Sequence, residues 1–124
     1  MNTNTEPALR RARLLVAYNG AAFHGFALTP GTVTVAQTLN DTIEQITGSP
    51  AAVLGAGRTD AGVHAWGQVV HVDLADTTDL DRVVFSMNSL LDPDIVIREC
   101  EWVSQDFDAR HSALWREYRY TVLN

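Results

Sequence analysis

The sequence predicts an α+β domain of the ferredoxin-like type, in which two helices cover one face of an antiparallel-type sheet. Two observations support this prediction. Short β-rich runs alternate with two stretches of helical periodicity in the order β-α-β-β-α-β, and one further strand follows. The 124 residues suffice for one hydrophobic core and are too few for two ordinary domains.

The first half of this pattern begins with an apolar run at 13–18 that stops at the turn signal Asn19-Gly20. A helix is expected after Thr34 and Gln37, which have the spacing of a capping box. Gly48 ends that helix, and short strands are expected at 52–55 and 68–74. The apolar stripe of the helix consists of Val35, Leu39, Ile43 and Ile46.

The second half contains a helix with Thr78 as its expected N-cap and Asp92-Pro93 as its end. Its apolar stripe consists of Leu80, Val83, Val84, Met87, Leu90 and Leu91. Strands are expected at 95–103 and 115–123. In the last strand, Tyr118 and Tyr120 share one face.

Composition places the chain among ordinary globular proteins, with 46% apolar and 19% charged residues. Its apolar runs are too short to span a membrane. Residues 1–10 are polar and are expected to form a disordered arm, so the domain itself is expected at 11–124. Cys100 is the single cysteine, which excludes an internal disulfide and fits a reducing cytoplasm.

The charge pattern gives evidence both against and for the binding of nucleic acid. The net charge is −6, and all nine basic residues are arginines, which is unlike a protein that binds nucleic acid mainly through phosphates. The arginines are nevertheless clustered, which allows a local positive surface on an acidic chain. They concentrate at Arg10, Arg11 and Arg13, at Arg58, and at Arg110, Arg116 and Arg119.

Several familiar chemistries are excluded. Gly55-Ala56-Gly57 lacks the third glycine of a dinucleotide loop, because Asp60 occupies that position. No serine sits in a strained turn between a strand and a helix. The histidines are scattered and form no ligand pair, so no metal is expected. They are His24, His64, His71 and His111.

Two segments remain open to two interpretations. In the loop 58–64, Asp60 fits a turn that caps backbone amides, with Gly62 supplying a positive φ. With Arg58 beside it, the same carboxylate would stay ionised, as a nucleophile or general base requires. The strand 115–120 is either an ordinary strand with inward tyrosines or a stacking platform for an unpaired base, with arginines meeting phosphate.

Taken together, several segments resemble the tRNA pseudouridine synthase A family. They occur in that family's order and spacing from about Arg13 to the last residue, and the Arg-Thr-Asp-Ala-Gly-Val-His loop is highly specific to it. The segments are Tyr18-Asn19-Gly20, Phe23-His24-Gly25, residues 55–65, Gly67-Gln68-Val69, Asn88-Ser89-Leu90-Leu91, Asp94-Ile95, Phe107-Asp108-Ala109-Arg110 and Arg116-Glu117-Tyr118-Arg119-Tyr120.

This resemblance implies an enzyme that converts uridine to pseudouridine in the tRNA anticodon stem-loop, without cofactor or metal. It implies that Asp60 is the catalytic aspartate and that Arg58 pairs with it and helps displace the target base. It also implies that Tyr118 stacks on the flipped uracil. A homodimer is expected for the full-length form, and no membrane partner.

The chain departs from the family in two respects. It has Gly25-Phe26-Ala27 where the family has Gly-Trp-Gln, and Val35-Ala36-Gln37 where the family has a Val-Gln-Gly-like segment. The family also continues into a second half that resembles the first. The chain is therefore expected to be the N-terminal, catalytic-loop half and to show little or no activity alone.

Two other functions remain open at this point. One is a non-catalytic RNA-binding module that has kept the fold. The other is a plain ferredoxin-like domain in which Asp60 only caps a turn.

Overall fold

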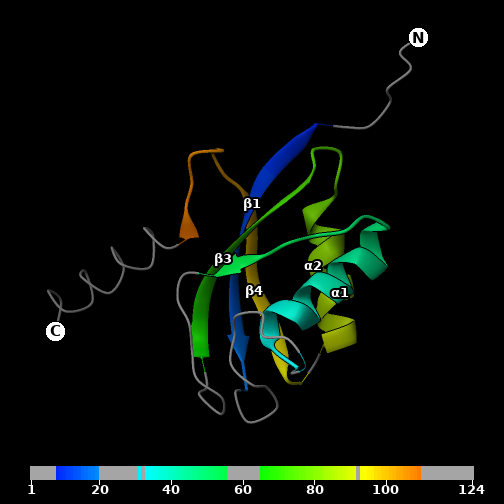
Figure 1. Ribbon diagram of the computed structural model, residues 1–124, viewed down its shortest axis with the longest axis vertical. Helices are drawn as coiled ribbons and strands as arrows, with labels where there is room; N and C mark the ends of the chain where they lie inside the picture. Colours follow the sequence, from blue (N-terminus) through cyan, green and yellow to red (C-terminus); the bar gives the residue numbers. More distant parts are fainter. Residues whose placement is uncertain (1–7, 20–30, 32, 56–64, 92, 110–124) are drawn as a thin grey trace, which may run out of the picture.

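The structure is a computed structural model that describes residues 8–19, 31, 33–55, 65–91 and 93–109. Strands and helices follow one another in the expected order β-α-β-β-α-β (Figure 1). The elements are β1 (Leu9–Tyr18), α1 (Val35–Thr47), β2 (Leu54–Gly55), β3 (Ala65–Ala75), α2 (Leu80–Leu91) and β4 (Ile95–Trp102). The additional strand expected at 115–123 lies outside the described residues.

The four strands form one sheet in the order β2-β3-β1-β4, and every pairing is antiparallel. Both helices pack on the same face of this sheet (Figure 1). Because β1 and β3 are central, the helix after β1 must cross over β3 to reach β2, which is the split β-α-β arrangement. The predicted ferredoxin-like α+β fold is confirmed.

Strand β1 begins earlier than the sequence predicts. Leu9 and Arg10 pair with Ala75 and Leu74 of β3, so these two positions of the expected disordered arm belong to the sheet. Their own sequence is not apolar enough to indicate a strand, but the long partner β3 satisfies their backbone groups. Residues 1–7 of the arm lie outside the described part of the chain.

Helix α1 begins with the predicted cap. The hydroxyl of Thr34 accepts a hydrogen bond from the Gln37 amide at 3.3 Å. The side chain of Gln37 donates forward to Asp41 at 2.8 Å, so only half of the expected box is seen among the described contacts. Gly48 ends the helix with a φ of 81°, and its N–H donates to the Glu44 carbonyl at 2.8 Å. That conformation favours glycine.

Helix α2 is capped by Asp79 and not by Thr78. The helix starts at Leu80, and the Asp79 carboxylate accepts from the Arg82 amide at 3.3 Å. Thr78 lies in the preceding turn, where its N–H donates to the Ala75 carbonyl at 3.0 Å. Both residue types are good caps, and the aspartate also meets the positive end of the helix dipole.

The core lies between the helices and one face of the sheet. Alternate residues of β1, β3 and β4 point into it, as the two-residue period of strands requires. Its most deeply buried side chains are Leu14, Val16, Val35, Leu39, Ile43, Val70, Val72, Met87 and Ile95. A second, smaller cluster of Leu15, Val69 and Ala109, with Phe107 packed against it, covers the opposite face.

Neither helix of the described part of the chain is long and apolar enough to cross a membrane.

Candidate active site

The three residues predicted to carry the chemistry lie outside the described residues. Arg58 and Asp60 fall within 56–64, and Tyr118 falls within 110–124. The described residues define the strands to which these segments are joined.

The loop that contains Asp60 connects two neighbouring antiparallel strands. Strand β2 ends at Gly55, which pairs with Val70 of β3. Strand β3 starts five residues earlier, at Ala65, and Ala65 pairs with Tyr18 at the end of β1. The loop thus follows β2 and enters β3 at the end of the sheet where β1 terminates (Figure 1).

Three segments of the family pattern meet at this end of the sheet. The Tyr18 hydroxyl donates to the Gln68 side-chain oxygen at 2.7 Å, and Tyr18 is only 5% exposed. Next to it, the Asn19 amide donates to the Asp94 carbonyl at 2.8 Å. Residues distant in sequence therefore hold the ends of β1, β3 and β4 together beside Ala65, where the Asp60 loop ends and β3 starts.

The backbone of Gly67, in the Gly67-Gln68-Val69 segment, lies close to the side chain of Leu15. A Cβ atom at Gly67 would lie 3.2 Å from Cδ1 of Leu15, which is closer than ordinary van der Waals contact. The pairing of β1 with β3 also shifts register here, between Val16 and Tyr18. A larger residue at this bulge would require a small shift of the Leu15 side chain.

The Phe107-Asp108-Ala109 segment lies on the sheet face that the helices do not cover. Ala109 is fully buried against Leu15 and Val69. Its amide donates to Nδ1 of His71, at 3.1 Å. This face therefore joins the segment that precedes Arg110 to the strand that follows the Asp60 loop.

The N-terminal arginine cluster does not form a free positive surface. Arg11 pairs with Asp73 at 2.9 Å, and Arg13 pairs with Glu99 at 2.8 Å and with Glu101 at 3.3 Å. The Arg10 guanidinium stacks on Trp102, 5.0 Å from the ring centre. The local positive surface that the sequence allowed is therefore largely neutralised at this cluster.

Arg13 is held less completely than Arg11. Its side chain is 11% exposed, and its Nη1 is buried without a hydrogen-bond partner. The two glutamates occupy its other nitrogens from the edge strand β4. A buried donor without a partner costs free energy, so Arg13 contributes less to stability than its two ion pairs alone would suggest. It lies on the open face of the sheet, which is the face that the helices do not cover.

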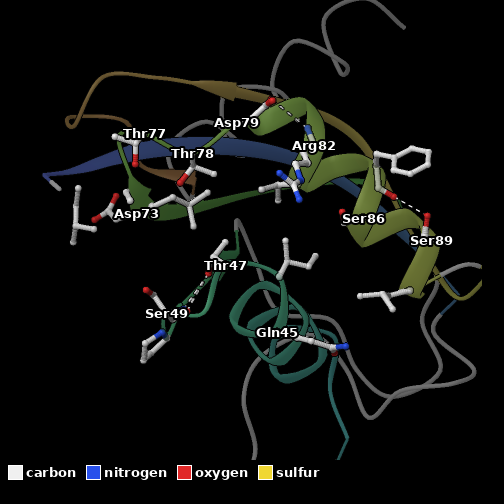
Figure 2. A pocket seen from close by; sticks show the side chains of 18 residues that line it. Gln45, Thr47, Ser49, Asp73, Thr77, Thr78, Asp79, Arg82, Ser86 and Ser89 are labelled. Carbon is white, nitrogen blue, oxygen red and sulfur yellow. Dashed lines mark hydrogen bonds between the residues drawn. The ribbon is translucent and has the colours of Figure 1, made fainter. Parts of the chain in front are cut away.

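An open hollow of about 1230 Å³ lies elsewhere, between α1, α2 and the last residues of β3 (Figure 2). Its lining is rich in Ser and Thr, with Arg82 and Asp79 beside the start of α2 (Figure 2). It reaches Asp73 and Ala75, whereas the Asp60 loop precedes Ala65 at the other end of the same strand. An 11-residue strand spans about 35 Å, so this hollow is not the predicted active site.

Metal binding has no support among the described residues. No group of three or more His, Cys, Asp or Glu side chains there could hold an ion. His71, which the sequence grouped with scattered histidines, is instead a buried hydrogen-bond acceptor. A hydrogen-bonded or surface position was expected for each histidine, but the sequence did not identify Ala109 as the partner of His71, because this contact depends on the return of residues 104–109 across the sheet.

Comparison with known proteins supports one family. The chain is 42% identical over 116 residues to tRNA pseudouridine synthase A of Brevibacillus brevis, which covers 94% of the chain and 48% of that protein. It is 46% identical over 115 residues to the protein of the same name from Hyphomonas neptunium, covering 92% and 46%. It is also 45% identical over 119 residues to the protein of the same name from Gloeobacter violaceus. That match covers 96% of the chain and 39% of the relative.

No model of a known protein family matches the chain. The chain spans about half the length of the curated relatives that it matches, or somewhat less. Across nearly all of its own length, it is similar to the N-terminal half of the tRNA pseudouridine synthase A proteins.

Proposed function

We propose that this chain is the N-terminal half of an enzyme that isomerises uridine to pseudouridine in the anticodon stem-loop of tRNA. The observation that carries the proposal is the match to proteins named tRNA pseudouridine synthase A, which covers 94% of the chain in one case. The enzyme acts in the cytoplasm, as a homodimer and without cofactor or metal.

Within this proposal Asp60 is the catalytic residue. It attacks the nucleotide or assists cleavage of the glycosidic bond, and Arg58 keeps its carboxylate ionised. Support comes from its place in the chain, between β2 and β3, next to the fastened strand ends at Tyr18 and Gln68. A loop on a rigid frame is where catalytic groups are commonly held.

Tyr118 supplies the surface that receives the base. A uridine that is detached and rejoined must first leave the helical stack, and the unstacked base is stabilised by an aromatic side chain. The fold supports this role indirectly. Ala109, nine residues before Tyr118, is buried against Leu15 of β1 and Val69 of β3, and β3 is the strand that follows the Asp60 loop.

A non-catalytic RNA-binding module is the second candidate. The observation that favours it is electrostatic: the net charge is −6, and Arg11 and Arg13 are engaged by acids. Few cations of the described residues are then free to bind phosphates, and binding without a second half is expected to be weak. This half alone is accordingly expected to show little or no synthase activity.

The test compares wild type with Asp60→Asn in the complete enzyme that contains this chain. Asparagine keeps the size and capping ability of aspartate but removes the charge. We expect pseudouridine formation on an unmodified tRNA transcript to fall on the order of a thousandfold. Thermal stability should change little.

Three outcomes would contradict the proposal. Near wild-type turnover by Asp60→Asn would show that the carboxylate is not catalytic. A large loss of thermal stability with intact turnover per folded molecule would support the turn-cap interpretation. Tight tRNA binding without turnover in wild type would favour the RNA-binding module.

A further inference from the structure

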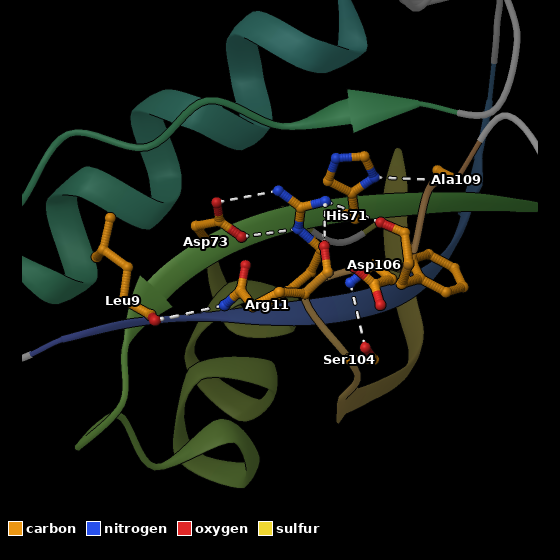
Figure 3. Close-up of polar contacts among 9 residues, drawn as sticks. Leu9, Arg11, His71, Asp73, Ser104, Asp106 and Ala109 are labelled. Atoms are coloured by element: carbon orange, nitrogen blue, oxygen red, sulfur yellow. Dashed lines mark hydrogen bonds and ion pairs between the residues drawn. The ribbon is translucent and has the colours of Figure 1, made fainter.

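The segment 104–109 returns across the open face of the sheet and is held there by side chains from the two central strands (Figure 3). After β4, a tight turn reverses the chain: the Asp106 amide donates to the Ser104 hydroxyl at 3.1 Å, and the Phe107 amide to the Ser104 carbonyl at 2.9 Å. The turn directs Phe107 and Ala109 towards Leu15 of the sheet.

Arg11 of β1 holds this segment by hydrogen bonds to the segment's backbone carbonyl groups. Its Nη1 donates to the carbonyl of Phe107 at 2.8 Å and to that of Gln105 at 3.3 Å. Its Nε and Nη2 donate to the two carboxylate oxygens of Asp73 at 2.9 and 3.2 Å. The planar fork is fixed by Asp73, so Nη1 is aimed at the segment (Figure 3). Lysine cannot make this set of contacts.

His71 of β3 holds the same segment by a different contact. It is 5% exposed, and its Nδ1 accepts the hydrogen bond from the Ala109 amide at 3.1 Å. An accepting nitrogen carries no proton, so the geometry assigns the neutral ring to this contact. The ring also meets Phe107 edge-on, at 6.2 Å between centres and 88° between planes.

We propose that Arg11, Asp73 and His71 form a clamp that positions the chain leading to Tyr118 relative to the loop that carries Asp60. The clamp joins residues 105–109 to β3, the strand that continues directly from that loop. These three are positioning residues. This inference rests on the proposed synthase function.

The clamp matters because the reaction tolerates only small displacements of the base. A base that is detached, rotated and rejoined must be held close to both the catalytic carboxylate and the aromatic ring on which it stacks. A displacement of about 1 Å can lower a rate about a hundredfold. A segment held only by an apolar cluster can slide, whereas directional hydrogen bonds at Phe107 and Ala109 fix its register.

Two substitutions at His71 separate the hydrogen bond from the packing. His71→Asn keeps an acceptor close to the position of Nδ1 but removes most of the ring. His71→Phe keeps a ring against Phe107 but removes the acceptor. In the complete enzyme we expect His71→Phe to lower the single-turnover rate of pseudouridine formation about tenfold or more. His71→Asn should retain most of the rate, and tRNA affinity should be nearly unchanged in both.

The expected difference in rate between His71→Asn and His71→Phe identifies a positioning role. A merely structural role would lower the melting temperature without this difference in rate. Equal rates for wild type, His71→Asn and His71→Phe at a temperature where all are folded would overturn the clamp. Arg11→Lys should behave like His71→Phe. A full rate for Arg11→Lys would remove Arg11 from the clamp.

Amide exchange distinguishes failure of the clamp from failure of the proposed function. In the 124-residue chain, the Ala109 amide should be protected in wild type and His71→Asn and unprotected in His71→Phe. Free exchange at Ala109 in wild type would overturn the clamp whatever the activity. An inactive wild-type enzyme with a protected Ala109 would instead overturn the synthase function, and with it the role of the clamp in catalysis.

Discussion

The side-chain amide of Asn88 in α2 binds both backbone polar groups of Ile97 in β4. Its Oδ1 accepts from the Ile97 N–H at 2.8 Å, and its Nδ2 donates to the Ile97 carbonyl at 3.1 Å. The N–H and C=O of one strand residue point to the same side, and β4 is an edge strand of the sheet that the described residues form. Asn88 therefore closes the outer edge of β4 at this residue, where another strand could otherwise pair.

Replacing Asn88 with leucine, which has a similar size, should lower the free energy of unfolding by about 1–3 kcal/mol. Leucine covers Ile97 but leaves its N–H and C=O without partners. Asn88→Ala should cost less, because water can reach the backbone groups. Urea unfolding followed by circular dichroism would measure both values.

The neighbouring Ser89→Ala is a suitable control. Ser89 is exposed, and its hydroxyl bonds only within the helix, to the Phe85 carbonyl. We expect a change within about 0.5 kcal/mol. A neutral result for Asn88→Leu would show that the edge of β4 does not depend on this amide. Sedimentation should also reveal more self-association in Asn88→Leu than in Ser89→Ala.

The thiol of Cys100 is expected to react slowly. Burial raises its pKa to about 11, and Cys100 packs against the main core from β4. Since the thiolate is the reactive form, iodoacetamide labelling at neutral pH should be about a hundredfold slower than for an exposed thiol. Labelling in urea provides the reference rate. A folded-state rate close to that reference would mean that the sulfur is accessible.

Tyr118 is predicted to contact the target base, although it lies outside the described residues. Tyr118→Phe keeps the ring and deletes the hydroxyl, whereas Tyr118→Ala removes both. If stacking contributes about 1–3 kcal/mol, alanine should weaken engagement of tRNA by the complete enzyme clearly more than phenylalanine does. Equal binding by the two variants would count against stacking.

The order of elements was predictable because helices and strands bury side chains with different periods. Val35, Leu39 and Ile43 recur at helical spacing and are all buried, as expected. The start of β1 was not predictable. Leu9 and Arg10 belong to the strand only because β3 is long enough to pair with them.

The motif at 58–64 predicts a catalytic loop, which stays a prediction because the loop lies outside the described residues. The contacts of the neighbouring strands could not be predicted from the sequence. The Arg11–Asp73 pair depends on the register that places Arg11 opposite Asp73 across two strands. The contacts of His71 with Ala109 and of Asn88 with Ile97 depend on how separate elements approach each other. Spacing along the chain contains little information about either.

The final prediction concerns the stability of the Arg11–Asp73 pair in acid. The hydrogen bond from Arg11 lowers the pKa of Asp73 below its ordinary value, because it favours the charged carboxylate in the folded state. Folding is therefore stabilised above the ordinary pKa, and this contribution is lost as the pH falls through the lowered value, below about pH 4.

Asp73→Asn should thus be less stable than wild type at pH 7 and nearly equal to it in strong acid. The pair is partly exposed, with 21% and 34% of the two side chains accessible, so the difference at pH 7 should be about 1 kcal/mol or less. Glu44→Gln, at an exposed position of α1, is the matched control and should follow the wild-type curve. Urea unfolding between pH 2 and pH 7, about the range in which aspartate titrates, would measure all three proteins. A deficit of Asp73→Asn that stays constant down to the lowest pH would show that Asp73 stabilises the fold through packing and not through its charge.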